Sequence, residues 1–224
     1  MRCSEGGLVR AFIRAFVLSV FSVFVAAANT SVLFQGTLGS DDQIALFQFT
    51  LAAAGPVTIQ SYGYGGGTAG ATTIPAGGFA ALAVLFAPLG GDYVQAKIDN
   101  GGHCPPAQLD PVTGNCSDPF IQTTLDAGTY YLGLSVNDNV PLTGILADGY
   151  TQTGNPGFTC AEGGLSGQFC DVTDALFRTR TGDWAVQFTG ADTVTNVNVP
   201  EPSTIFIVVS GGLLGALLAR RRFC

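Results

Sequence analysis

Side chains able to exchange protons near neutral pH are scarce in this sequence of 224 residues, which contains a single histidine, His103. Acyl-transfer catalysis needs such a base beside an activated nucleophile. His103 lies in a Gly-Gly-His-Cys-Pro-Pro loop, and the chain has no Gly-x-Ser-x-Gly elbow. The glycine cluster at 63–70 lacks the following lysine of a phosphate-binding loop. The sequence therefore predicts no catalytic site.

Loop aspartates offer a different chemistry, the binding of a hard cation. Calcium takes several carboxylate and carbonyl oxygens, and three candidate ligands, Asp99, Asp110 and Asp118, lie around one cysteine loop. They match neither an EF-hand nor a nonapeptide calcium repeat, so solvated turn aspartates are the alternative. Calcium is the one cofactor that the sequence suggests.

Cysteine usage favours an oxidising compartment. Two cysteines lie in the terminal segments, and four remain between them: Cys104, Cys116, Cys160 and Cys170. Four cysteines permit three pairings. Because 104–116 and 160–170 are each rich in Gly, Pro, Asn and Asp, we predict a disulfide across each of these loops. A zinc site is the rival interpretation, but no Cys-x₂₋₄-Cys spacing is present.

The elements that carry these residues are predicted to be strands. Phe47, Phe49 and Leu51 fall on one face of an extended segment, and the same alternation recurs at 129–136. Clusters of Gly, Asn and Asp separate such segments. The candidate strands are 32–34, 44–51, 57–62, 79–86, 93–98, 129–136, 184–188 and 194–199.

These patterns predict an all-β fold: an antiparallel β-sandwich, jelly-roll-like, with roughly six to nine short strands. No helical period of useful length occurs outside the two ends of the chain. The segment 142–162 shows no clear pattern, and we expect a long surface loop closed by the second disulfide.

The first 28 residues have the features of a secretory signal peptide. Three arginines precede an apolar run at 15–25, and three alanines precede Asn29. We predict a signal helix and cleavage after Ala28. A buried amphipathic helix is the alternative, but the apolar run has no polar face.

The last 25 residues, 200–224, combine three features in a fixed order. Pro200, Glu201 and Pro202 interrupt any helix or strand. An apolar stretch at 204–219 follows, close to the length of a transmembrane helix. Three arginines then anchor the end in the cytoplasm by the positive-inside rule: Arg220, Arg221 and Arg222. We expect the residues before Pro200 to lie on the side of the membrane opposite to the cytoplasm.

This order of motif, apolar segment and Arg-rich tail resembles the PEP-CTERM sorting signal. The resemblance implies that Pro200, Glu201 and Pro202 are recognised by an exosortase, a membrane enzyme that removes the tail and transfers the body to the envelope or matrix. A permanent single-span anchor would keep the same topology, so both outcomes stay open. Together with the signal peptide, the resemblance divides the chain into a signal peptide (1–28), an exported domain (29–199) and the sorting signal (200–224).

The exported domain is strongly acidic. It contains 14 acidic residues against Lys97, Arg178 and Arg180, a net charge of −11. Such a surface repels polyanions, so nucleic acids are not expected as partners. Solubility is the simplest explanation of this charge.

A second, looser resemblance covers roughly residues 32–139. The segments FQFTLAAAGPVTIQSY, GGFAALAVLF, DPVTGN and LDAGTYYLGLSVNDN are similar, in this order, to exported β-sandwich domains of the pre-peptidase C-terminal kind. The resemblance implies a noncatalytic accessory or adhesive module. We expect no attached protease or hydrolase domain in this chain.

Together these features predict a noncatalytic protein of the cell envelope or exopolysaccharide matrix. Its expected partners are signal peptidase, an exosortase-like enzyme, the bacterial membrane and exopolysaccharide. The alternative is a secreted carbohydrate- or calcium-binding module. For sugar stacking, Trp184, Tyr62 and Tyr64 would have to be exposed, and burial in the core is the other possibility for these rings. A secreted hydrolase is the third hypothesis.

Overall fold

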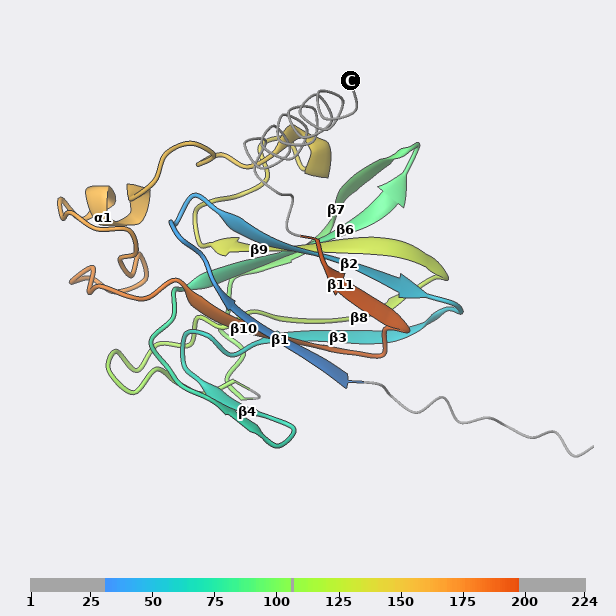
Figure 1. Cartoon of the computed structure of the whole chain (residues 1–224), viewed down its shortest axis with the longest axis horizontal. Coiled ribbons are helices and arrows are strands. Elements are labelled where there is room, and N and C mark those ends of the chain that lie inside the picture. Colours follow the sequence, from blue (N-terminus) through green and yellow to red (C-terminus); the bar gives the residue numbers. More distant parts are fainter. Residues whose placement is uncertain (1–30, 106, 198–224) are drawn as a thin grey trace, which may run out of the picture.

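The computed structural model describes residues 31–105 and 107–197. Within them, two antiparallel sheets pack face to face (Figure 1). The four-stranded sheet has the order β1 (Ser31–Thr37), β10 (Asp183–Thr189), β3 (Gly55–Ser61), β8 (Phe120–Leu125). The five-stranded sheet has the order β11 (Thr193–Asn196), β2 (Ile44–Leu51), β9 (Gly128–Val136), β6 (Ala81–Leu89), β7 (Asp92–Asp99).

The alternation that predicted β2 sets which of its side chains enter the core. Every second residue from Ala45 to Leu51 is buried, and β9 pairs beside it so that Phe47 lies opposite Leu132 and Phe49 opposite Tyr130. Side chains on one face of a strand recur with period two. The pairing therefore places two apolar rows side by side on the inner face of the five-stranded sheet.

Aromatic rings from both sheets fill the interior. Phe188 of β10 lies 5.4 Å from Phe47 and 5.7 Å from Phe49, measured between ring centroids. Trp184 contacts Phe47 edge to face at 5.5 Å. A fully buried phenylalanine contributes roughly 1.5–3 kcal/mol by leaving water, so these contacts make a large contribution to holding the two sheets together.

The outer faces of both sheets are also covered in part. The small hairpin of β4 (Gly67–Ala69) and β5 (Thr72–Ile74) packs on Tyr62, which follows β3, and on Ala185 of β10. On the other sheet, Tyr150 packs with Leu82, Val84 and Phe86. Its ring lies over Gly133, where any side chain would collide with the Tyr150 hydroxyl.

The predicted all-β, antiparallel sandwich is confirmed for the described residues. The predicted strands are present, but the sequence patterns missed β4, β5 and β8. The segment 142–162 is more ordered than expected: it contains a 3-10 helix, η1 (Leu146–Asp148), and a short helix, α1 (Phe158–Glu162). Tyr150 is the physical reason, because it ties this segment to the sheet. The predicted signal helix and C-terminal transmembrane helix lie outside the described residues.

Candidate functional site

A cluster of charged side chains lies buried among the loops of the four-stranded sheet. We call it the Arg180 cluster, after its cation, and it comprises Tyr64, Asp110, Asp171 and Arg180. Arg180 Nη1 lies 3.0 Å from Asp110 Oδ1, and its Nη2 lies 2.8 Å from Asp171 Oδ2. The guanidinium carbon is 4.1 Å from the centre of the Tyr64 ring, and the Tyr64 hydroxyl donates to Asp171 Oδ2 at 2.7 Å. One cation thus joins three loops.

The two carboxylates of this cluster are held ionised. Burial by itself would raise the pKa of Asp171, but the hydroxyls of Thr173 and Tyr64 and the Arg180 guanidinium bind the carboxylate and bring its pKa below the ordinary value. For Asp110, burial is likewise outweighed by Arg180 and by the backbone and hydroxyl of Thr113, so its pKa is also lowered. The paired charges therefore persist at neutral pH.

Asp118 has a different environment. Its Oδ1 accepts hydrogen bonds from the Ser61 hydroxyl (2.8 Å) and the Tyr64 backbone N–H (3.1 Å), and its Oδ2 accepts from the Gly65 N–H (2.7 Å). Burial raises the pKa of this carboxyl despite these donors. Because protein donors occupy both oxygens, Asp118 organises the turn after β3.

The three predicted calcium ligands are not brought into one group. Asp99 Oδ1 accepts from the Gly101 and Phe120 N–H groups, Asp110 pairs with Arg180, and Asp118 faces the turn after β3. Among the described residues no set of three or more His, Cys, Asp or Glu side chains is arranged to hold a metal ion. Proximity to the cysteine loop in sequence did not bring the three carboxylates together, because each of them binds a different set of donor groups in the protein.

Both predicted disulfides are present, Cys104–Cys116 and Cys160–Cys170. The first closes the loop that carries Asp110. The second joins α1 to the residue preceding Asp171. The two bonds therefore brace the loops whose carboxylates meet at Arg180.

Asp41 is a buried carboxylate that sequence analysis did not single out as a site residue. Its Oδ1 accepts from the Gly157 N–H, and its Oδ2 accepts from the Thr159 backbone N–H (2.8 Å) and hydroxyl (2.7 Å). It fixes the start of α1 from the loop between β1 and β2. Its role needed the tertiary fold, because its partners lie 116 and 118 residues away.

The aromatic rings considered for sugar stacking lie in the core instead. Trp184 is 7% exposed, Tyr62 is 6% exposed and Tyr64 is fully buried. Trp184 packs against Phe47, and the Tyr64 ring faces Arg180. These three rings therefore expose little surface on which a sugar could stack.

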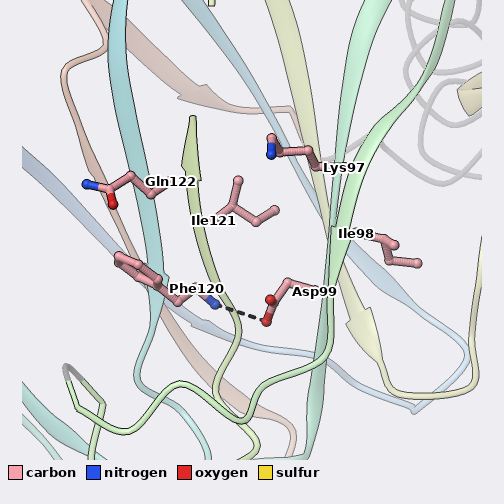
Figure 2. A pocket seen from close by; sticks show the side chains of 6 residues that line it. All are labelled: Lys97, Ile98, Asp99, Phe120, Ile121 and Gln122. Carbon is pink, nitrogen blue, oxygen red and sulfur yellow. Dashed lines mark hydrogen bonds between the residues drawn. The ribbon is translucent and has the colours of Figure 1, made fainter. Parts of the chain in front are cut away.

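A small pocket opens between the edge strands β7 and β8. It has a volume of about 220 Å³, and we call it the seam pocket; its lining residues are Lys97, Ile98, Asp99, Phe120, Ile121 and Gln122. Figure 2 shows Lys97 and Asp99 pointing from β7 toward β8, while Ile98 points the other way. His103 lies next to it, with Nδ1 3.3 Å from Asp99 Oδ2. A second pocket, of about 330 Å³, lies beside the β4–β5 hairpin and includes Ile74, Pro75 and Asp183 in its lining.

The comparison with protein families concerns the end of the chain. Residues 198–222 match the family described as the PEP-CTERM protein-sorting motif. The chain carries a PEP-CTERM sorting motif. The match spans Pro200, Glu201 and Pro202 and the three terminal arginines, as the sequence resemblance predicted. The PEP-CTERM motif implies export to the cell envelope or beyond, with an exosortase as the processing partner.

The PEP-CTERM residues lie outside the described part of the chain. Within residues 31–105 and 107–197, no helix is long and apolar enough to cross a membrane. The predicted membrane segment, 204–219, and the signal segment, 1–28, are not in these ranges.

Among solved structures, the chain is similar to the pre-peptidase C-terminal domain of a collagenase from Bacillus anthracis. The identity is 14%, the match covers 75% of this chain and 89% of that one, and the TM-score is 0.32. This is the kind of domain that residues 32–139 resemble in sequence. At this TM-score the likeness carries no argument about function. No curated protein sequence matches the chain.

Proposed function

We propose that this chain is an exported, noncatalytic structural protein of the cell envelope or extracellular matrix, released from its membrane segment by an exosortase. The observation that carries the proposal is the PEP-CTERM motif at 198–222. In this scheme the apolar segment 204–219 holds the chain in the membrane until the enzyme acts at or near Pro200, Glu201 and Pro202.

Residues 29–199, the body of the protein, have features typical of proteins outside the cytoplasm. Both disulfides close short loops, and such bonds persist where the surroundings are oxidising. The apolar run and alanines at 1–28 have the pattern of a signal peptide, so the two ends support the same route.

A structural role is supported by the way the buried charges are used. Asp110 and Asp171 pair with Arg180, Asp118 organises a turn, and Asp41 holds the start of α1. These carboxylates fix loops to one another. They consequently contribute to a rigid scaffold.

The experiment compares the C-terminus of the native protein with that of a motif variant. Mass spectrometry of the protein recovered from its own host should find no peptide from 204–224. Glu201→Ala should retain this tail, because the central residue of the motif is lost. Glu162→Ala, an exposed glutamate in α1, is the matched control and should be processed like the wild type.

Two outcomes would contradict the proposal. A wild-type protein that keeps its Arg-rich tail would be a permanently anchored protein. Equal processing of wild type and Glu201→Ala would mean that the motif is not what the processing enzyme recognises.

A further inference from the structure

The seam pocket lies between two sheet edges that face each other. β7 ends the five-stranded sheet and β8 ends the four-stranded sheet, and in the described part of the chain neither pairs with the other. The first half of β7 is covered, because Gln95 N–H donates to Gly144 O at 2.7 Å. The open part of the seam begins at Lys97.

Lys97 is a positively charged side chain without an ion pair among the described residues, in a domain whose net charge is strongly negative. Of the three basic side chains at 31–105 and 107–197, Arg178 and Arg180 form ion pairs and Lys97 forms none. Its side chain points across the seam toward β8 (Figure 2). With 14 acidic residues in the body, an exposed and unpaired lysine in the lining of this pocket is a local exception in charge.

The opposite wall offers backbone hydrogen-bonding groups. Ser61 N–H donates to Pro119 O, and Ile121 pairs with Ile59, so the backbone groups of Pro119 and Ile121 face β3. Phe120 N–H instead faces the seam and donates to Asp99 Oδ1 at 3.2 Å. Because the direction of backbone groups alternates along a strand, the Gln122 N–H and C=O also face the seam. Neither has a partner among the described residues.

These groups define the ligand chemistry. A negative group would pair with Lys97, while neighbouring hydroxyls would bond to the Gln122 backbone and to Asp99 Oδ2. The volume of about 220 Å³ is below the roughly 300–1,000 Å³ of pockets for drug-sized ligands, so the site suits one small ring. The acidic surface around it disfavours polyanions.

We propose that the seam pocket binds a single sugar acid, a pyranose with one carboxylate, through Lys97 and the free edge of β8. The ligand is either the free acid or the terminal residue of an otherwise neutral glycan. Binding takes place on the folded body and does not depend on how the tail is processed.

The test titrates the full chain, purified in detergent, with D-glucuronate while the backbone amide signals of Gln122 and Asp99 are followed by NMR. We expect saturable binding with a Kd on the order of 1 mM. Lys97→Gln should weaken it about tenfold, the loss of one charge-assisted contact. Methyl glucoside, which has no carboxylate, should bind about as weakly to the wild type as glucuronate does to the variant.

Arg178→Gln is the matched control, because it removes one positive charge from a partly exposed ion pair elsewhere. It should leave the affinity unchanged. A neutral oligosaccharide ending in glucuronate separates the two sources of the ligand: tighter binding than the monomer identifies a glycan end, and equal binding identifies the free acid.

The proposal is overturned by three results. The first is the absence of saturable shifts at about 50 mM glucuronate. The second is equal weakening by Lys97→Gln and Arg178→Gln, which would indicate general charge attraction. The third is self-association of Lys97→Gln without any glucuronate binding by the wild type, because Lys97 would then serve to block edge-to-edge pairing of β7.

Discussion

Arg180 and Asp110 form an ion pair across 70 residues of sequence, with 3.0 Å between Nη1 and Oδ1. The side chain of Arg180 is 5% exposed and that of Asp110 is 1% exposed. Asp171 shares the same guanidinium. Since removing Arg180 leaves both carboxylates buried and uncompensated, the stability of the loop region depends on this side chain.

Arg180→Met should therefore destabilise the protein strongly. It leaves Asp110 and Asp171 buried without their cation, and we expect a loss of about 3–5 kcal/mol in the free energy of unfolding. Urea denaturation of the full chain, with disulfides intact, measures it. Arg178→Met should cost less than Arg180→Met, because water reaches the Arg178 side chain, which is 42% exposed, while its partner Asp174 is 10% exposed. Equal losses would show that the Arg180 cluster matters no more than the partly exposed Arg178–Asp174 pair.

The pH dependence of stability should follow from the same carboxylates. The pKa values of Asp110 and Asp171 are held below the ordinary 3.8 by their donors. Their folded pKa values thus lie below the unfolded ones, so these groups stabilise the fold above pH 3.8, and this contribution is lost as the pH falls through the folded pKa. Asp118 acts in the opposite sense, because burial raises its pKa and its protonation favours the fold.

We expect the free energy of unfolding to fall as the pH drops below about 4, with a flatter fall in Arg180→Met. In that variant both carboxylates lose one of the groups that lower their pKa values, while the hydrogen bonds from Thr113, Thr173 and Tyr64 remain. Unfolding measured at several pH values between about 2 and 7 gives both curves. Parallel curves for wild type and variant would refute a role of Arg180 in acid sensitivity.

The two disulfides should differ in their resistance to reduction. Cys160 and Cys170 are buried, whereas Cys104 and Cys116 are partly exposed. Thiol–disulfide exchange needs access to a sulfur atom. Partial reduction of the folded protein should accordingly free Cys104 and Cys116 first. Alkylation followed by mass spectrometry detects the order, and simultaneous labelling of all four would contradict it.

Tyr150→Phe should leave stability unchanged or raise it by up to about 1 kcal/mol, because a buried polar group without a partner is costly. The Tyr150 hydroxyl is buried and has no hydrogen-bond partner among the described residues, and burial raises its pKa. Tyr130→Phe is the matched control: its hydroxyl donates to Asp126 O at 3.0 Å, so its loss should cost about 0.5–1.5 kcal/mol. Thermal or urea unfolding compares the two. A larger loss for Tyr150→Phe would mean that water or another group satisfies this hydroxyl.

Features encoded in short segments could be predicted from the sequence. Strand β2 was identified with its exact bounds, because alternation is a local property and burial of one face enforces it. The two disulfides join cysteines that are 12 and 10 residues apart. Both pairings were therefore predictable from the short separation of the cysteines along the chain. The sorting motif is also linear: its proline pair, apolar stretch and arginines are contiguous along the chain.

What the sequence alone could not decide is which distant residues meet. Asp118 carries the same carboxylate as a calcium ligand, but Ser61, Tyr64 and Gly65 occupy it, and these partners lie 57, 54 and 53 residues away. The open seam beside Lys97 exists because two sheets end on the same side of the sandwich without pairing. Local patterns specify faces and turns, whereas the partners of a buried charge depend on how the sheets stack, which only the tertiary structure determines.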